Sequence, residues 1–368
     1  MTAGTEKRLF VAATSQNDGK TTCTLGILDA YRSLSKSVGF IKPVGQRYVL
    51  VNGQTIDEDT VLIQQVCDLR CPLKDMSPVA IERNFTRKFL DDPEGVAPRL
   101  RHSIQSSYAI AAKNSDLVVI EGTGHAGVGS VFDLNNACVA HMLKAKVIIV
   151  TLGGIGRPVD EIALNQTLFE KENVEVIGVI ANKIQPEKLE QTRDYLTRAF
   201  ARRGLKLLGA IPYAPQLTWP TVGQVAEAIH ATVINGRQSL SNKIADIVVG
   251  AMTAHNAIKF IKDKALLVVP GDRDDVVLAA AITDLLRKDI QLSGIVLTGG
   301  MQLAVQTREL IMRTHIPVLV VDMPTFEATS VLHDITVKIG ESDAEKIVLA
   351  TSLVRQYVDL ELLWKLLS

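Results

Sequence analysis

The sequence predicts an α/β protein, with a doubly wound parallel sheet in the first half and a smaller α/β domain in the second. Two observations lead to this prediction. Short apolar runs, typical of strands covered on both faces, alternate with segments of helical periodicity. The chain also has 368 residues, of which 47% are hydrophobic, so it is long enough to form two cores.

The first half contains six strand candidates, most of them apolar on both faces. These candidates lie at residues 8–13, 38–41, 116–120, 146–151, 175–181 and 206–211. Helical patterns separate them, at about 21–36, 57–67, 99–114, 134–144, 160–172 and 186–203. A sheet of this kind binds ligands at the carboxyl ends of its strands, so we expect the loops that follow the strands to carry the functional residues.

A cluster of prolines at 212–220 separates this segment from a second α/β set. The second set has strand candidates at 265–269, 294–297 and 317–321 and helical patterns at 274–288 and 302–314. We therefore predict a first domain over residues 1–215 and a second over 216–342. The remaining segment, 343–368, has apolar residues at helical spacing, and we expect it to pack on the second domain or at a subunit interface.

Composition argues against several classes of partner. Forty Lys and Arg balance forty Asp and Glu, so no net field favours nucleic acid or an anionic membrane. The N-terminus has no apolar signal core, and no apolar run approaches the roughly 18–20 residues that span a bilayer. We expect a cytoplasmic protein that binds neither nucleic acid nor membranes.

The loop after the first strand has the pattern of a phosphate-binding loop. Residues 11–22 read Val-Ala-Ala-Thr-Ser-Gln-Asn-Asp-Gly-Lys-Thr-Thr, with Thr14 where the usual pattern has its first glycine. Backbone N–H groups and the positive helix terminus of such a loop hold phosphates. Lys20 would reach the terminal phosphates, and the Thr21 hydroxyl would hold Mg²⁺. The candidate nucleotide-binding residues here are Thr14, Asn17, Asp18, Gly19, Lys20, Thr21 and Thr22.

Further polar residues follow other strands of the first half. Lys42 comes after the second strand and can reach phosphates, unless it is a surface lysine before a turn. Asp59 lies in an acidic run that opens a helix, where it either complements the helix dipole or binds Mg²⁺. Glu121 ends the strand at 116–120, where phosphate-binding-loop proteins keep an acid for metal or water. Asn182 follows the strand at 175–181 and offers a donor and an acceptor to a purine base.

The second half has two small polar loops at the ends of adjacent strands. They contain Asp272 and Arg273 in one loop and Thr298, Gly299 and Gly300 in the other. Together they could form a notch for an anion or a nucleotide, with Arg273 facing a phosphate. The alternative is structural, with Asp272 as a helix N-cap and the glycines as turns.

The first half resembles the dethiobiotin synthetase-like P-loop family, which also includes the ATP-dependent part of cobyrinic acid a,c-diamide synthase. The family's Gly-Thr-x-Thr-x-x-Gly-Lys-Thr corresponds to residues 13–21, its Lys-Pro-Val to 42–44 and its Glu-Gly to 121–122. The family's serine after Lys-Pro-Val is not seen in residues 45–47. The resemblance implies ATP and Mg²⁺ as cofactors and a homodimer. It assigns catalysis to Lys20, Lys42 and Glu121, and the metal to Thr21, Asp59 and Glu121.

The second half resembles a DRTGG domain, named for the residues seen here as Asp272-Arg273 and Thr298-Gly299-Gly300. The tandem resembles the N-terminal regulatory portion of long bacterial phosphotransacetylases over nearly the whole chain. The acyl-transferring domain of those enzymes would lie beyond residue 368, so we expect no acyl transfer from these residues. Glutamine-dependent amide formation is not expected either, because no cysteine follows Cys138.

These observations leave three functions open. In the first, the P-loop domain binds or slowly hydrolyses ATP while the DRTGG domain senses a small ligand, such as a nucleotide. In the second, the protein is an ATP-dependent synthetase that phosphorylates a carboxylate or carbamate. The third is a scaffold with a vestigial P-loop. The fusion to a DRTGG domain and the missing substrate serine favour the first.

Overall fold

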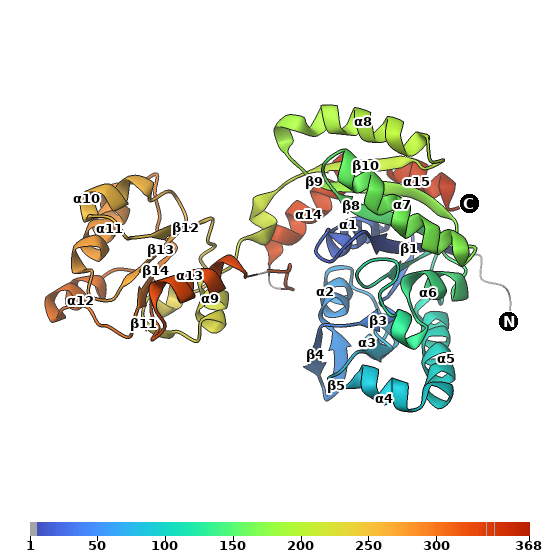
Figure 1. Ribbon diagram of the computed structural model, residues 1–368, viewed down its shortest axis with the longest axis horizontal. Coiled ribbons are helices and arrows are strands. Elements are labelled where there is room, and N and C mark those ends of the chain that lie inside the picture. The colour runs from blue at the N-terminus through green and yellow to red at the C-terminus, as the bar shows by residue number, and fades with distance from the viewer. Residues whose placement is uncertain (1–5, 336, 342) are drawn as a thin grey trace. The chain divides into compact units, whose positions relative to one another are not determined.

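The computed structural model describes residues 6–335, 337–341 and 343–368 (Figure 1). The chain forms two units. The first contains Met1–Ala214 together with Ile339–Ser368, and the second contains Pro215–Lys338. In the described part of the chain, no helix is both long and apolar enough to cross a membrane.

The first unit is built on a parallel sheet of six strands with the order β10-β9-β8-β1-β7-β2. Its strands are β1 (Lys7–Ala13), β2 (Val38–Ile41), β7 (Leu117–Glu121), β8 (Lys146–Leu152), β9 (Val176–Ile184) and β10 (Leu207–Pro212). Nearly every residue of β1, β7 and β8 is buried, as expected of strands covered on both faces. The predicted fold class is therefore confirmed.

Helices connect these strands and cover the sheet. They are α1 (Lys20–Ser33), α2 (Glu58–Val66), α5 (Pro93–Ala111), α6 (Asn136–Met142), α7 (Gly156–Lys171) and α8 (Leu189–Ala201). Helix α5 begins at Pro93 rather than at the expected residue 99. The Asp92 side chain accepts a hydrogen bond from Gly95 N, and a proline suits the first helical position, so this end is capped.

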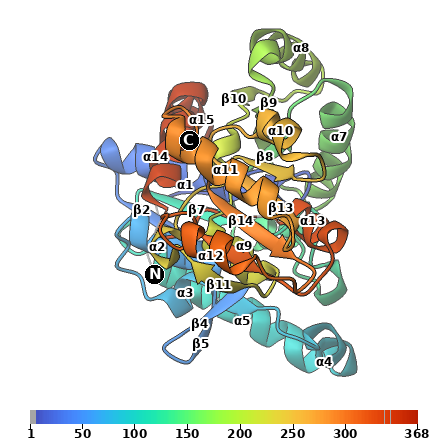
Figure 2. The ribbon, with the colours of Figure 1, turned by 90° about the vertical axis from the view of Figure 1, so that its left-hand side faces the viewer.

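The segment between β2 and α5 contains short elements that the sequence analysis did not predict. They are β3 (Val44–Gly45), β4 (Tyr48–Val51), β5 (Gln54–Asp57), α3 (Leu73–Met76), β6 (Val79–Ala80) and α4 (Phe85–Asp91). β4 and β5 form an antiparallel hairpin at the periphery of the first unit (Figure 1, Figure 2). Its turn is Asn52-Gly53, with φ of 50° and 77°, which is a strong hairpin signal. The hairpin matters because β5 ends at Asp57, directly before α2.

The second unit contains a five-stranded sheet with the order β11-β15-β14-β13-β12, in which only the edge strand β11 is antiparallel. Its strands are β11 (Thr232–Asn235), β12 (Asp246–Val249), β13 (Ala265–Pro270), β14 (Gly294–Thr298) and β15 (Val318–Val320). Its helices are α9 (Val222–Ala228), α10 (Ala254–Ala257), α11 (Asp274–Leu286), α12 (Val305–Ile311) and α13 (Thr325–His333). The sequence predicted only the three inner strands, because the edge strands are not continuous apolar runs.

The C-terminal segment belongs to the first unit, which corrects the expectation that it packs on the second domain. It forms α14 (Ala344–Tyr357) and α15 (Leu360–Leu366). Helix α14 packs directly on α1, so closely that a Cβ on Gly26 would overlap the Val354 side chain. Val358 then forms a bridge with Gly209 of the edge strand β10. Helical periodicity predicted a buried face but not which domain covers it.

Polar contacts reinforce this packing. The Arg355 guanidinium donates to the Asp29 carboxylate at 2.7 Å, and the Tyr31 hydroxyl donates to the Leu360 carbonyl at 2.8 Å. The Tyr31 ring also lies 5.0 Å from the ring of Trp364, measured between centroids. The second half of the helix that starts at the phosphate-binding loop is therefore supported by residues that follow the second unit in sequence.

Candidate functional site

Sheet register brings the ends of three strands together. Val11 of β1 pairs with Glu121 of β7, and Ile41 of β2 pairs with Ile120. Lys42 follows Ile41, so the register places it beside Glu121. The loop after β1 lies at the same edge, because all three strands are parallel. The strand-end residues that the sequence singled out therefore share one edge of the sheet.

The loop after β1 is held in shape by an internal carboxylate. The Asp18 carboxylate is buried and accepts hydrogen bonds from the Thr14 hydroxyl at 2.8 Å and from Ser15 N at 2.6 Å. Burial raises the pKa of Asp18, and the hydrogen bonds from Thr14 and Ser15 oppose this shift. Asp18 thus stabilises the loop conformation, a role that the phosphate-binding pattern alone did not specify.

Asn182 at the end of β9 fixes the outer side of this loop. Its Nδ2 donates to the Asp18 carbonyl at 2.8 Å, and its Oδ1 accepts from Lys183 N at 2.9 Å. Lys183 Nζ donates to the Asn17 carbonyl at 2.7 Å. Gly19 has φ of 103°, and a Cβ there would overlap Asn182 Nδ2. Only glycine fits this position, and Asn182 touches the loop directly.

Lys20 begins α1 and points its ammonium back into the loop. Its Nζ donates to the Ser15 carbonyl at 3.3 Å and to the Gly124 carbonyl at 3.2 Å. Burial lowers the pKa of Lys20, and the nearby Glu121 carboxylate opposes this shift. Backbone carbonyls are weak partners for an ammonium, so phosphate oxygens could replace them. Thr22 lies on the first turn of the same helix and is partly buried.

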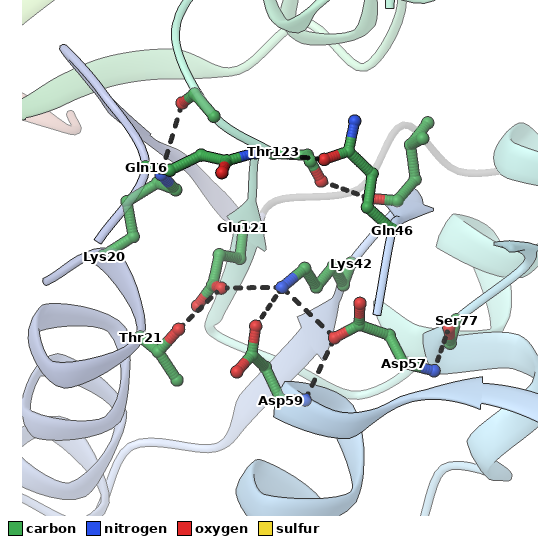
Figure 3. Close-up of polar contacts among 12 residues, drawn as sticks. Gln16, Lys20, Thr21, Lys42, Gln46, Asp57, Asp59, Ser77, Glu121 and Thr123 are labelled. Carbon is green, nitrogen blue, oxygen red and sulfur yellow. Dashed lines mark hydrogen bonds and ion pairs between the residues drawn. The ribbon is translucent and has the colours of Figure 1, made fainter. Parts of the chain in front are cut away.

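Lys42 lies at the centre of a buried ion cluster (Figure 3). Its Nζ is 3.1 Å from Asp57 Oδ1 and 3.2 Å from Glu121 Oε1, and it also pairs with Asp59. The Thr21 hydroxyl donates to the same Glu121 oxygen at 3.1 Å. Asp57 caps α2 by accepting from Asp59 N at 3.0 Å. One carboxylate thus links the start of α1 to the end of β2.

The electrostatics of this cluster favour a charged Lys42. Burial alone would lower the pKa of Lys42, but the charges of Glu121, Asp59 and Asp57 outweigh it and raise that pKa well above its ordinary value. Removing the lysine would leave buried carboxylates without this partner, which costs several kcal/mol in typical cases, about 3–5 kcal/mol. The lysine is therefore integral to the site and not a surface residue before a turn.

The residues present fit a magnesium ion. Among the described residues, Glu121 Oε2 is buried and has no hydrogen-bond partner. The other oxygen, Oε1, accepts hydrogen bonds from both Thr21 and Lys42. No group of three His, Cys, Asp or Glu side chains in that part of the chain is arranged to hold a metal. Mg²⁺ usually needs only one or two carboxylates together with phosphate oxygens and water. Thr21, Glu121 and Asp59 can supply that smaller set.

The structure also places residues at the site that the sequence analysis did not name. Gln16 Nε2 donates to Gln46 Oε1 at 3.3 Å, which joins the phosphate-binding loop to the segment after β3 (Figure 3). Thr123 donates from its hydroxyl to the Val44 carbonyl and from its N–H to Asn136 Oδ1 at 3.1 Å. Thr123 directly follows the Glu-Gly motif and Gln46 lies two residues after the Lys-Pro-Val motif, and this proximity was the available signal.

In the second unit, Arg273 is engaged within its own loop region. Its Nη2 donates to the Met252 carbonyl at 2.8 Å, its Nη1 to the Gly250 carbonyl at 3.4 Å, and its Nε to Asp275 Oδ1 at 2.9 Å. These bonds hold the loop after β12 against the start of α11. The observed contacts of Arg273 are therefore structural.

The other predicted residues of this region shape the same sheet edge. The Thr298 hydroxyl is 2.7 Å from the Thr325 hydroxyl, and Gly299 and Gly300 have φ of 79° and 64°. The alternative role of Asp272 as a helix N-cap was wrong: α11 begins at Asp274, so the residue at its N-cap is Arg273.

Comparison with known proteins supports the tandem organisation. The chain is 27% identical to phosphate acetyltransferase of Pseudomonas putida (strain KT2440) over 366 residues, which cover 95% of this chain and 50% of that protein. It is also 27% identical to the Nitrosomonas europaea phosphate acetyltransferase over 370 residues, which cover 97% of this chain and 51% of that protein. The chain thus spans about half the length of the curated relatives it matches. The predicted resemblance to phosphotransacetylases over nearly the whole chain is confirmed.

Solved structures are more distant. Cobyrinic acid a,c-diamide synthase from Mycobacterium smegmatis, with bound ADP and magnesium, is 18% identical with a TM-score of 0.34, covering 57% of this chain and 87% of that one. The CBS and DRTGG domains of Clostridium perfringens pyrophosphatase are 16% identical with a TM-score of 0.28, covering 49% and 87%. Likenesses this weak carry no functional argument.

Family models divide the chain close to the first boundary between the two units. Residues 224–335 match the DRTGG domain model. Residues 7–221, more than half of the chain, match the AAA_26 model, described as an AAA domain. The chain therefore belongs to the AAA_26 family and carries a DRTGG domain after its P-loop domain.

Proposed function

We propose that the first unit binds Mg-ATP and hydrolyses it slowly, and that the second unit senses a small ligand and regulates this activity. One observation carries the nucleotide part of the proposal. Lys20 and Thr21 at the start of α1 lie at the same edge as Lys42 and Glu121, and Thr21 and Glu121 are joined by a hydrogen bond of 3.1 Å. Two lysines, a hydroxyl and a carboxylate are the groups that phosphoryl transfer requires.

The roles follow from position. Backbone N–H groups of the loop and the Lys20 ammonium would hold the β- and γ-phosphates. Thr21, Glu121 and Asp59 would hold Mg²⁺, which neutralises phosphate charge when it is bound. Lys42 would stabilise the charge that develops on the transferred group. Asn182 and Lys183 border the loop on the side opposite Lys42, where the predicted contact of Asn182 with a purine base would be made.

The regulatory part rests on the fusion of the two domains. Curated relatives that match both units are phosphate acetyltransferases, and the chain covers about half of each. We infer that this chain acts as the corresponding regulatory portion, as a homodimer, with a nucleotide or another small anion as the ligand of the second unit. The loops with Asp272, Arg273 and Thr298 to Gly300 are the proposed location of that ligand.

One observation favours the synthetase alternative. Gln46 and Gln16 present exposed carboxamides beside the phosphate-binding loop. Gln46 follows Lys-Pro-Val, near the place where the family's substrate serine is expected. These carboxamides could orient a carboxylate or carbamate acceptor next to the γ-phosphate.

Phosphate release from the full chain separates the two functions. With Mg-ATP alone, we expect slow release that a second nucleotide shifts, while single carboxylates and amines leave it unchanged. A sharp rise with one carboxylate or amine would instead establish a synthetase and identify its substrate. If the chain neither binds ATP nor releases phosphate, only the third function remains, a scaffold with a vestigial P-loop.

A substitution at the metal site links this activity to the geometry. Glu121→Gln is expected to lower phosphate release at least about tenfold, because it removes a charge that holds the metal. Glu190→Gln on the exposed face of α8 serves as the control and should leave the rate unchanged. Equal rates in the wild type and Glu121→Gln would contradict the assignment of Glu121.

A further inference from the structure

The Lys42 ammonium occupies the acidic cluster of the candidate site. Its Nζ pairs with Asp57, Asp59 and Glu121, and all four side chains are buried, with Lys42 6% and Glu121 1% exposed (Figure 3). Asp59 and Glu121 are also two of the three groups that the proposed function assigns to magnesium. The same two carboxylates therefore have two candidate cations.

Lys42 neither balances the charge of this cluster nor contacts every carboxylate oxygen in it. Its four side chains together carry two more negative than positive charges when all are ionised. In the described part of the chain, Glu121 Oε2 is buried with no hydrogen-bond partner. A buried carboxylate oxygen of this kind is costly unless something binds it. A divalent cation in place of Lys42 would balance the three carboxylates better than the single charge of the lysine does.

We propose that Lys42 occupies the metal position of the nucleotide-free protein and that Mg²⁺ and Lys42 exclude each other from Asp59 and Glu121. This inference rests on the proposed nucleotide site and adds an order of binding. The metal enters with the nucleotide, whose phosphates supply the missing ligands. Lys42 then moves from the carboxylates to the phosphates.

The lysine side chain is suited to such an exchange. Four methylenes let the ammonium change partners without a backbone shift, and its compact charge pairs equally with carboxylate or phosphate oxygens. Like charges a few ångströms apart in a poorly solvated site repel strongly, so both cations cannot share the two carboxylates. Without phosphates, an ejected Lys42 would lose its partners, which disfavours metal binding to the free protein.

Direct metal binding tests the exchange. Mn²⁺, a spectroscopic substitute for Mg²⁺, is titrated into the full chain without nucleotide and followed by electron paramagnetic resonance. The wild type should bind it weakly. Lys42→Met, which keeps an unbranched side chain and removes its charge, should bind Mn²⁺ at least about tenfold more tightly, a change of about 1.4 kcal/mol. Lys42→Arg, which keeps the charge, should bind as weakly as the wild type.

Two controls keep the result specific. Lys146→Met removes a lysine at the opposite end of the strands, where its ammonium contacts Glu175 and the carbonyls of Leu366 and Ser368. This variant should not change Mn²⁺ affinity. The double variant Lys42→Met/Glu121→Gln should lose the gain in Mn²⁺ affinity that Lys42→Met shows. If Lys42→Met does not fold, Lys42→Met/Asp57→Asn removes one charge of each sign and should show the same gain. Unchanged Mn²⁺ affinity in the folded variant overturns the proposal. Because no nucleotide is present, this outcome is independent of whether the wild type binds ATP.

Discussion

Removing residues 339–368 is expected to unfold the first unit, although the phosphate-binding loop lies more than three hundred residues earlier in the sequence. The deletion uncovers the side of α1 that faces α14 and one edge of β10. It also removes six buried apolar side chains of the tail: Ala350, Leu353, Val354, Val358, Leu363 and Leu367. Losing one large buried side chain costs about 2–5 kcal/mol, against a total stability of about 5–15 kcal/mol.

Amide hydrogen exchange measures this effect by unit. In the chain 1–338, we expect β1, β7 and β8 to lose protection while β13 and β14 of the second unit keep theirs. The complete chain provides the reference. Unchanged protection of β1 would show that α14 and α15 are dispensable.

A single contact probes the same interface. Gly26→Ala should destabilise the first unit by about 1–3 kcal/mol, because its Cβ would overlap Val354. Val354→Gly in the same chain removes the overlapping atoms and should restore part of the loss. Equal stability of the wild type and Gly26→Ala would contradict the close packing of α1 and α14.

Gly19→Ala is expected to lower ATP affinity by about 100-fold or more. The loop has φ of 103° at this residue, where a side chain is strained by about 1–3 kcal/mol, and the new Cβ would overlap Asn182 Nδ2. The loop must then change the N–H directions that hold the phosphates, and a hundredfold loss corresponds to about 2.7 kcal/mol.

Fluorescent ATP analogue binding measures this loss. Gly156→Ala is the matched control, because an added Cβ at the start of α7 has nothing within 4 Å. It should bind like the wild type. Retained affinity in a folded Gly19→Ala protein would show that the loop does not hold the phosphates.

Much of the first unit could be predicted because its central strands are buried on both faces, which leaves a plain apolar signal. The convergence of Lys20, Lys42 and Glu121 at one edge also followed from the sequence, since parallel strands end together. The pairing of Lys42 with three carboxylates did not follow. It depends on β5, which follows an Asn-Gly turn that is visible in the sequence. It also depends on the register between strands, which the sequence pattern alone does not reveal.

Other features depend on partners that are distant in sequence. The periodicity of 343–368 predicted helices correctly, but only the packing of Val354 on Gly26 shows which unit they join. Asn182 was singled out for a base, and its hydrogen bond to the Asp18 carbonyl could not be foreseen. A residue type reveals which bonds a side chain can make, whereas the fold decides which of them it makes.

Calorimetric titration of the complete chain with ATP, with and without Mg²⁺, tests the central claim most directly. We predict saturable binding to the wild type that weakens without Mg²⁺. We also predict a loss of about 100-fold or more in folded Lys20→Ala, because an ammonium contributes about 1.5–3 kcal/mol per phosphate contact. Absence of binding to the wild type, or equal affinity in Lys20→Ala, would contradict a nucleotide site at this loop.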